Sequence, residues 1–149
     1  MKEGYNREVI SLSESQTRTF GRDLAATLRN RDVVALYGSL GTGKTVLVKG
    51  ICEGLGVTEA VTSPTFTLVQ LYEGREGTVT HIDAYRLHPG AESEELSEPI
   101  DSESIVLIEW AERVGHLLPE RRVDIVLNWV DEETRKIDCH DKRGITDAG

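Results

Sequence analysis

The stretch Val-Val-Ala-Leu-Tyr-Gly-Ser-Leu-Gly-Thr-Gly-Lys-Thr occupies residues 33–45. Its first five residues form a continuous apolar run, which is typical of a parallel strand buried on both faces. Residues 38–45 satisfy G-x-x-x-x-G-K-[S/T], the pattern of a loop that binds phosphate groups. A helical pattern runs from Lys44 to about Glu53, and Gly54 ends it. Strand, glycine-rich loop and helix in this order are the context that the pattern requires, so the stretch predicts an α/β fold with a phosphate site.

The residue types of this loop suit phosphate chemistry. Its glycines, Gly38, Gly41 and Gly43, allow consecutive backbone N–H groups to point inward and form an anion-binding nest at the start of a helix. Lys44 supplies a positive charge for the β- and γ-phosphates of a nucleotide. The hydroxyl of Thr45 is a hard oxygen of the kind that Mg²⁺ prefers. We therefore expect this loop to bind a nucleotide together with Mg²⁺.

Two carboxylates follow other strand-like runs. Residues 104–108 form a second buried strand that ends at Glu109, which fits the Walker B position of a phosphate-binding ATPase, although Asp is commoner there. Ligands of α/β sheets bind at this end of the strands. Asp83 ends the run 78–83 and is a second candidate. The sequence leaves open whether Asp83 is a site carboxylate or a turn residue.

The remaining pattern predicts one α/β domain over residues 1–149, with a mixed sheet of the P-loop NTPase type. Its central strands are parallel, and hairpins and helices flank them. In the first half of the chain we expect a strand over 7–12, then a helix that Ser13 and Gln16 cap, and a hairpin formed by 66–72 and 78–83. The acidic segment 91–103 is expected to be solvated or to bind a partner. After the second buried strand we expect a short helix that ends at His116, and a hairpin of 123–130 and 134–140 near a sheet edge. The chain is expected to fray from about Asp141.

Composition excludes several classes of protein. The chain has 149 residues with 17 basic and 26 acidic side chains, a net charge of −9, so we expect it to bind nucleic acid weakly on its own. No run of 18 apolar residues occurs and the first residues are polar, which predicts a cytoplasmic chain without a membrane span. Cys52 and Cys139 are expected to be reduced, buried thiols. The histidine spacing does not suit a zinc site.

Four segments together resemble the TsaE family (also called YjeE), small bacterial P-loop ATPases of tRNA threonylcarbamoyladenosine synthesis. They are the loop 38–45, Ser-Pro-Thr-Phe-Thr-Leu-Val at 63–69, His-Ile-Asp-Ala-Tyr-Arg-Leu at 81–87 and Leu-Ile-Glu-Trp at 107–110. The resemblance spans about residues 7–140. Two positions depart from it, because the family usually has an acidic residue where Ser39 stands and Ala where Thr42 stands. Neither side chain is needed to bind phosphate.

The resemblance implies a role for each matching residue. Residues Leu40 to Thr45 would hold the phosphates of ATP or ADP, Thr45 and Glu109 would bind Mg²⁺, and Asp83 would lie near the γ-phosphate and support hydrolysis. Thr65 resembles part of a nucleotide-sensing loop. In such proteins the base lies between the start of the first helix and the C-terminal hairpin, which nominates Glu14 and Arg135. The catalytic set implied is Lys44, Asp83 and Glu109.

The resemblance also implies partners. The chain would be a Mg²⁺-dependent ATPase, slow alone, that supports a TsaD–TsaB pair in transferring threonylcarbamoyl to the adenosine beside the tRNA anticodon. It would meet tRNA only through those partners. Two other functions stay open from the residues: a small-molecule or nucleotide kinase, and a nucleotide-gated binding protein with negligible turnover. A GTPase is disfavoured because the sequence has no Asn-Lys-x-Asp segment.

Overall fold

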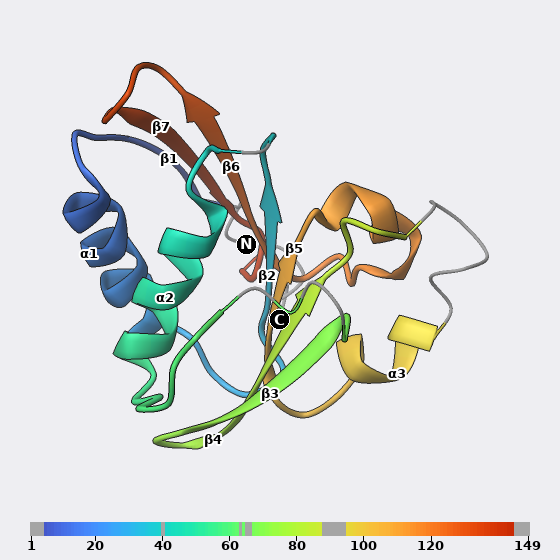
Figure 1. Ribbon diagram of the computed structural model, residues 1–149. Coiled ribbons are helices and arrows are strands. Elements are labelled where there is room, and N and C mark those ends of the chain that lie inside the picture. Colours follow the sequence, from blue (N-terminus) through green and yellow to red (C-terminus); the bar gives the residue numbers. More distant parts are fainter. Residues whose placement is uncertain (1–4, 40, 63, 65–66, 88–94, 145–149) are drawn as a thin grey trace.

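The computed structural model describes residues 5–39, 41–62, 64, 67–87 and 95–144. Its core is a seven-stranded sheet in the order β1-β7-β6-β2-β5-β4-β3 (Figure 1). The strands are β1 Tyr5–Ser11, β2 Val33–Tyr37, β3 Val69–Gly74, β4 Gly77–Asp83, β5 Ile105–Glu109, β6 Val123–Trp129 and β7 Arg135–Asp141. The helices are α1 Glu14–Ala25, α2 Lys44–Gly54, α3 Ser97–Ile100 and the 3-10 helix η2 Ala111–Leu117.

The central strands are parallel, as the sequence predicts. β5 lies between β2 and β4 and runs parallel to both, and β6 runs parallel to the other edge of β2. The antiparallel strands are β3, β7 and β1. The predicted fold class, a mixed sheet with parallel central strands, antiparallel hairpins and flanking helices, is confirmed. Because the carboxyl ends of parallel strands lie at one edge of the sheet, β2, β5 and β4 end side by side.

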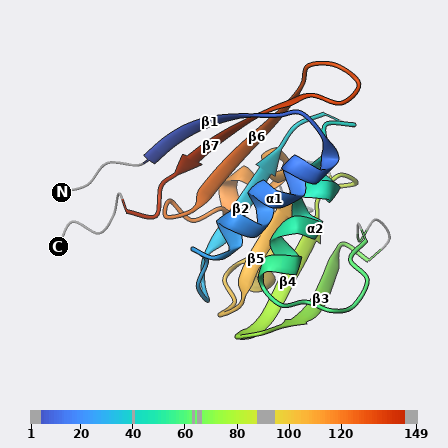
Figure 2. The ribbon, with the colours of Figure 1, turned by 90° about the vertical axis from the view of Figure 1, so that its left-hand side faces the viewer.

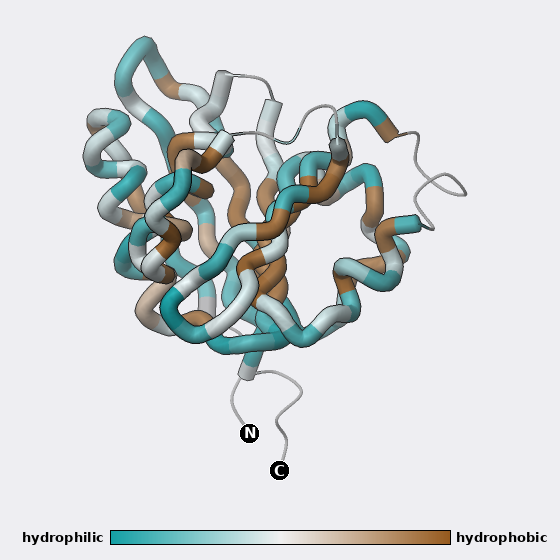
Figure 3. Tube along the Cα trace, turned by 60° about the horizontal axis from the view of Figure 1, so that its bottom comes forward, coloured by the Kyte–Doolittle hydropathy of each residue, from teal (hydrophilic) through white to brown (hydrophobic). Residues whose placement is uncertain are grey.

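Helices cover the two faces of the central strands. α1 and α2 pack on one face, and α3 and η2 lie on the other (Figures 1 and 2). The alternation within β2 explains both contacts, because Val34 and Leu36 join the core on the α1–α2 side while Val33 and Ala35 join the core on the opposite side. The hydrophobic segments accordingly follow the middle of the molecule in Figure 3. This two-sided burial is the reason that the run 33–37 lacks polar alternation.

The first helix begins where its capping residues predict. The backbone N–H of Gln16 donates to Ser13 Oγ at 3.1 Å, and the backbone N–H of Leu12 donates to Gln16 Oε1 at 2.7 Å. Helix α1 then packs closely on α2 at Gly50, where an added Cβ would lie 2.3 Å from the carbonyl oxygen of Arg18. The start of α1 is thereby fixed beside the start of α2, next to the glycine-rich loop.

Two predicted elements differ in detail. The first hairpin is present, but its leading strand begins at Val69 rather than 66, and Leu68 has a left-handed φ of 67°. The segment that ends at His116 is a kinked 3-10 helix, since Val114 departs from helical angles. In the acidic segment, residues 95–103 include buried Leu96 and Ile100, so part of it packs on the core. Residues 91–94 lie outside the described residues.

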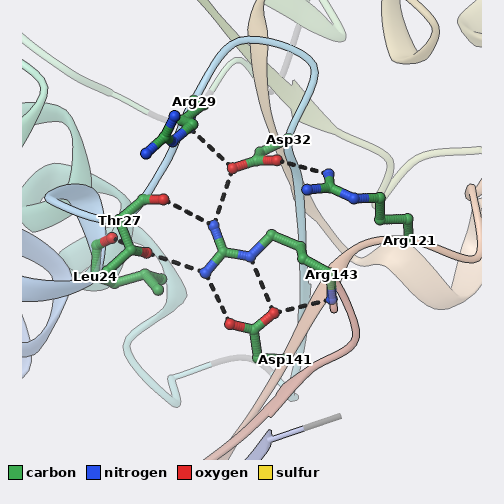
Figure 4. Close-up of polar contacts among 7 residues, drawn as sticks. All are labelled: Leu24, Thr27, Arg29, Asp32, Arg121, Asp141 and Arg143. Atoms are coloured by element: carbon green, nitrogen blue, oxygen red, sulfur yellow. Dashed lines mark hydrogen bonds and ion pairs between the residues drawn. The ribbon is translucent and has the colours of Figure 1, made fainter. Parts of the chain in front are cut away.

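The prediction that the chain frays from about Asp141 is wrong for residues 141–143. β7 continues to Asp141, and the guanidinium of Arg143 donates to Asp141, Asp32 and Thr27 (Figure 4). Asp32 also accepts from Arg121 at 3.1 Å. The composition of the tail does not predict this cluster, because Thr27 and Asp32 lie more than a hundred residues before Arg143 in the sequence.

Both cysteines are free and buried, as expected. Among the described residues, no helix is long and apolar enough to cross a membrane.

Candidate active site

One cavity of about 820 Å³ opens at the carboxyl ends of β2, β4 and β5. The parallel register explains its position, because Glu109 at the end of β5 pairs with Leu36 of β2 and with Asp83 of β4. The loop that follows β2 therefore lies beside both carboxylates. The cavity is lined by Ser13, Glu14, Thr17, Gly41, Thr42, Gly43, Lys44, Thr45, Val46, Asp83, Tyr85, Glu109, Trp110, Glu132, Glu133 and Arg135.

The glycine-rich loop delivers the start of α2 to this cavity. Gly43 precedes the helix with φ 98° and ψ 18°, a left-handed conformation that a side chain would disfavour. No side chain caps the first turn of α2. The first backbone N–H groups of a helix have no partner within the helix, and with the helix dipole they favour an anion at this point. The loop can therefore bind phosphate oxygens.

Lys44 is buried in the cavity wall and bonded to its own loop. Its Nζ donates to the carbonyl oxygens of Gly38 and Ser39, the latter at 2.9 Å, and lies 4.3 Å from the centre of the Trp110 ring. Burial lowers the pKa of Lys44, although nearby carboxylates act in the opposite direction. The direct partners of the Lys44 ammonium group are backbone carbonyl oxygens and an aromatic ring. An anionic ligand would give this buried group a partner of opposite charge.

The two carboxylates have different neighbours. Glu109 is 3% exposed, and its Oε2 lies 2.7 Å from Nε2 of the fully buried His81. Asp83 is 6% exposed, and its Oδ1 accepts from the backbone N–H of Tyr85 at 3.0 Å. Both carboxylates lie on the side of the sheet that α2 covers. They give the cavity two acidic groups near Lys44.

The other end of the cavity lies between α1 and the β6–β7 hairpin. Glu14 stands in the first turn of α1, and Arg135 begins β7. The guanidinium of Arg135 donates to the carbonyl oxygens of Asp131 at 2.7 Å, Thr134 at 2.9 Å and Gly41 at 3.1 Å. It thus ties the hairpin to the glycine-rich loop and fixes the width of this end of the cavity.

An aromatic pair forms a further wall. The rings of Tyr85 and Trp110 lie 4.8 Å apart, and Arg113 lies 5.8 Å from the centre of each. Trp110 has a left-handed φ of 59°, where the strand β5 ends and η2 begins. The turn directs the chain away from the sheet immediately after Glu109. A planar ring system beside Lys44 can pack against a ligand while the ammonium group binds its charge.

The structure brings most of the predicted site residues together. Glu14, Arg135, Lys44, Asp83 and Glu109 all line the one cavity, as do the loop residues 41–45. Gly38 does not line it and instead supplies a carbonyl oxygen to Lys44. Leu40 and Thr65 lie outside the described residues.

Sequence reasoning gave no role to His81 or Tyr85. Both belong to the segment 81–87, one of the four segments that resemble the TsaE family. Side chains of a strand alternate between its two faces, so His81 lies on the same face as Asp83. That alternation could have indicated His81 as a neighbour of the site. Its contact with Glu109 depends on the β4–β5 register, which the pattern does not give.

Comparison with known proteins identifies close relatives over most of the chain. The family described as "Threonylcarbamoyl adenosine biosynthesis protein TsaE" matches residues 11–137. The chain is similar to the tRNA threonylcarbamoyladenosine biosynthesis protein TsaE of Streptomyces coelicolor, with 41% identity over 80% of this chain and 86% of the relative. Its similarity to the protein of the same name from Aquifex aeolicus is 38% identity over 91% of this chain and 97% of the relative.

A solved structure has a fold similar to that of this chain. The crystal structure of Bacillus subtilis YdiB superposes with a TM-score of 0.78 at 29% sequence identity, covering 95% of this chain and 89% of that chain.

Proposed function

The chain belongs to the TsaE family of threonylcarbamoyl adenosine biosynthesis proteins, and on that premise we propose that it binds and hydrolyses ATP in support of this tRNA modification. The observation that carries the proposal is the cavity in which the loop 41–45, Asp83 and Glu109 meet. These parts suit phosphoryl transfer, in which positioning and charge stabilisation do most of the work. The partners we propose are a TsaD–TsaB pair, which would carry out the transfer itself.

The loop would hold the phosphates. Backbone N–H groups at the start of α2 would donate to the phosphate oxygens, and Lys44 would exchange its bonds to the Gly38 and Ser39 carbonyls for bonds to the nucleotide. A buried ammonium group gains more from such a charged partner than an exposed one does, because water screens it less. The affinity for a triphosphate would therefore depend strongly on Lys44.

The donor set of the cavity fits Mg²⁺. Thr45, Glu109 and Asp83 offer a hydroxyl and two carboxylates, all hard oxygens. Within the described part of the chain, His, Cys, Asp and Glu residues form no group of three that could hold a metal by itself. Mg²⁺ commonly takes one or two protein ligands and completes its shell with phosphate oxygens and water. When bound, it would supply positive charge to the phosphates, with Thr45 and Glu109 as its ligands.

Asp83 would support the reaction from the neighbouring strand. Its carboxylate lies beside Glu109 and can accept a hydrogen bond from a water molecule near the γ-phosphate. Of the described residues, Arg135 is the one arginine that lines the cavity, and its bonds to Gly41 and the hairpin place it at the end assigned to the base. A partner would then have to supply the charge that an arginine finger gives other phosphoryl-transfer sites. We therefore expect slow turnover in the isolated chain.

The opposite end of the cavity would hold the adenosine. Glu14 and Arg135 border it, and the side chain of Arg135 has a buried Nε without a hydrogen-bond partner among the described residues. A ribose or base acceptor would satisfy this donor.

Isothermal titration calorimetry with Mg–ATP tests the proposal. We expect Lys44→Ala to bind at least tenfold more weakly than the natural chain while its circular dichroism spectrum stays unchanged. Lys49→Ala is the matched control, because Lys49 lies on the same helix and does not line the cavity. Equal affinity of the two folded variants would contradict a phosphate site at this loop.

A further inference from the structure

A buried line of side chains runs from Glu109 to the loop that precedes β3. Glu109 Oε2 lies 2.7 Å from His81 Nε2, and the other ring nitrogen, His81 Nδ1, lies 3.5 Å from the hydroxyl of Tyr72. That hydroxyl also donates to the carbonyl oxygen of Thr62 at 3.2 Å. Glu109, His81 and Tyr72 are 3%, 0% and 3% exposed, so water has little access to the two contacts that His81 makes.

The hydrogen-bond roles along this line are constrained. An ionised Glu109 only accepts, so Nε2 of His81 must donate to it. In the neutral ring this leaves Nδ1 as an acceptor. Tyr72 therefore faces two acceptors, Nδ1 and the Thr62 carbonyl, and has one proton to donate. The contact with the Thr62 carbonyl is the shorter of the two, 3.2 Å against 3.5 Å, so this geometry favours donation to Thr62.

The hydroxyl of Tyr72 keeps that single proton under ordinary conditions. Burial raises the pKa of Tyr72, and the charges of neighbouring acidic groups act in the same direction, although the bond to Thr62 opposes them. Two exclusive arrangements follow. In one the hydroxyl donates to Thr62, and in the other it donates to His81.

The same loop is connected to the site at its far end. The backbone N–H of Asp83 donates to the carbonyl oxygen of Leu68 at 3.0 Å, just before β3 begins. Asp83 and Glu109 are adjacent in the sheet. Thr62 is therefore linked to Glu109 through Tyr72 and His81, and Leu68 is bonded directly to the backbone of Asp83.

We propose that His81 and Tyr72 are positioning residues that couple the carboxylate of Glu109 to the backbone at Thr62 through the one hydroxyl proton of Tyr72. The proposal rests on the function proposed above, in which Glu109 is a ligand of Mg²⁺. A shift of the Glu109 carboxylate moves the imidazole through the 2.7 Å bond. If the ring approaches Tyr72, the hydroxyl turns to Nδ1 and the Thr62 carbonyl loses its donor. Occupancy of the metal site would thereby alter the chain at Thr62.

Tyr72→Phe removes the hydroxyl and keeps the ring that packs in the core. Thr80→Val is the matched control, since Thr80 on β4 is, like Tyr72 on β3, a buried residue with a hydroxyl group. The hydroxyl of Thr80 is bonded to Ser104 at 2.7 Å and not to His81 or Tyr72. Hydrogen–deuterium exchange of peptides containing Thr62 is measured with ADP in EDTA and with ADP in Mg²⁺. Calorimetry of ADP binding accompanies each sample.

Two substitutions of His81 separate its two nitrogens. His81→Gln puts an amide nitrogen near the place of Nε2 and keeps the bond to Glu109, whereas His81→Asn reaches only the place of Nδ1. Partners of metal ligands typically change metal affinity by about 10–100-fold when they are lost. We expect His81→Asn to require about tenfold more Mg²⁺ for nucleotide binding, and His81→Gln to keep the natural requirement.

The natural chain and Thr80→Val should show a Mg²⁺-dependent change in exchange at Thr62, and Tyr72→Phe and His81→Gln should lose it while ADP affinity stays within about threefold. His81→Gln carries the same test if Tyr72→Phe does not fold. A full Mg²⁺-dependent change in both variants, or a natural Mg²⁺ requirement in His81→Asn, would overturn the coupling and leave the nucleotide site standing. A natural chain that binds no ADP would overturn the proposed function and the coupling with it.

Discussion

Glu109 shows how a single residue is prepared for its role by its surroundings. It ends a strand of four buried apolar residues, lies within hydrogen-bond distance of His81 and lines the same cavity as Lys44. Its burial and its contact with His81 restrict the orientations of the side chain and protect it from solvent. Such pre-organisation suits a metal ligand, since only a small shift of the carboxylate is needed when the ion binds.

Glu109→Gln tests this role in turnover. The amide keeps the shape of the side chain but removes the charge that would hold Mg²⁺. At saturating Mg²⁺ we expect phosphate release to fall about a hundredfold, with nucleotide affinity largely retained. Glu112→Gln is the control, because Glu112 is an exposed acidic neighbour of Lys44 that does not line the cavity. Natural turnover in Glu109→Gln would move the metal role to Asp83.

Single residues of the site could be predicted where the neighbouring residues in the sequence form a recognisable pattern. The loop 38–45 and the carboxylate of Glu109 follow buried runs, and this local context is visible in the chain. The bonds that His81 and Arg135 make could not be predicted, because they depend on which strands pair and in what register. Neither the β4–β5 register nor the approach of the β6–β7 hairpin to Gly41 is written in the local pattern.

The packing of α1 on α2 positions the phosphate loop at the scale of elements. This helix pair makes its closest approach through glycines, and at Gly21 an added Cβ would lie 2.7 Å from the carbonyl oxygen of Leu47. At Gly50 the clash would be with the backbone of Arg18. Backbone atoms cannot move aside as the end of a flexible side chain can, so the spacing of the two helices depends on these positions.

Gly50→Ala is therefore expected to destabilise the chain. An alanine normally favours a helix over glycine, but here its methyl group would force the helices apart, at a cost of about 2 kcal/mol in the free energy of unfolding. Gly115→Ala is the comparison, because a Cβ there meets nothing within 4 Å. Urea denaturation measures both. A Gly50→Ala chain as stable as the natural one would show that the helices are not in tight contact.

Most elements could be predicted from periodicity and capping residues. The start of α1 at Ser13, the buried strand β2 and both hairpins agree with the structure. The sequence could not show that β6 also pairs in parallel with β2, because a hairpin pattern specifies only the local partner. The kink in η2 was missed for a similar reason, since tertiary packing of Val114 overrides the helical pattern.

At the scale of the whole molecule, Arg143 ties the C-terminal segment to the amino end of β2 (Figure 4). Asp32 lies just before the first residue of β2, and the glycine-rich loop follows the last residue of β2. The cluster and the cavity are therefore at opposite ends of this strand. Of this cluster, Asp141 and Arg143 lie beyond residues 11–137, the part that matches the family. The contact should support stability without taking part in nucleotide binding.

Arg143→Gln is expected to lower the free energy of unfolding by about 3 kcal/mol at pH 7. The hydrogen bond from Arg143 lowers the pKa of Asp141 from its ordinary 3.8. A carboxyl with a lowered pKa in the folded state stabilises the fold above its unfolded pKa and loses that contribution as the pH falls through its folded value. The difference between the natural chain and the variant should therefore shrink at pH 3.

Urea denaturation at pH 7 and pH 3 measures this difference. Arg121→Gln serves as the control, because Arg121 is half exposed and should cost only about 0.5 kcal/mol. An equal difference at both pH values would show that the Arg143–Asp141 bond does not contribute as described.

The charge of the whole chain bears on tRNA. A net charge of −9 opposes phosphate binding, and Arg18 and Arg22, basic residues of the first helix, form ion pairs with Glu53. We expect a dissociation constant for tRNA weaker than about 10 μM at about 150 mM salt. Filter binding measures it, with a low-salt sample as the positive control. Tight binding at physiological salt would mean that the isolated chain reaches tRNA without partners.

The most direct test of the account is the rate of phosphate release from Mg–ATP by the natural chain, alone and with a TsaD–TsaB pair. The cavity supplies a phosphate loop, a lysine and two carboxylates, and a partner would supply the missing positive charge. We predict slow release from the isolated chain and a rise of at least tenfold when the pair is added, abolished by Glu109→Gln. Equal rates with and without the pair would contradict the account.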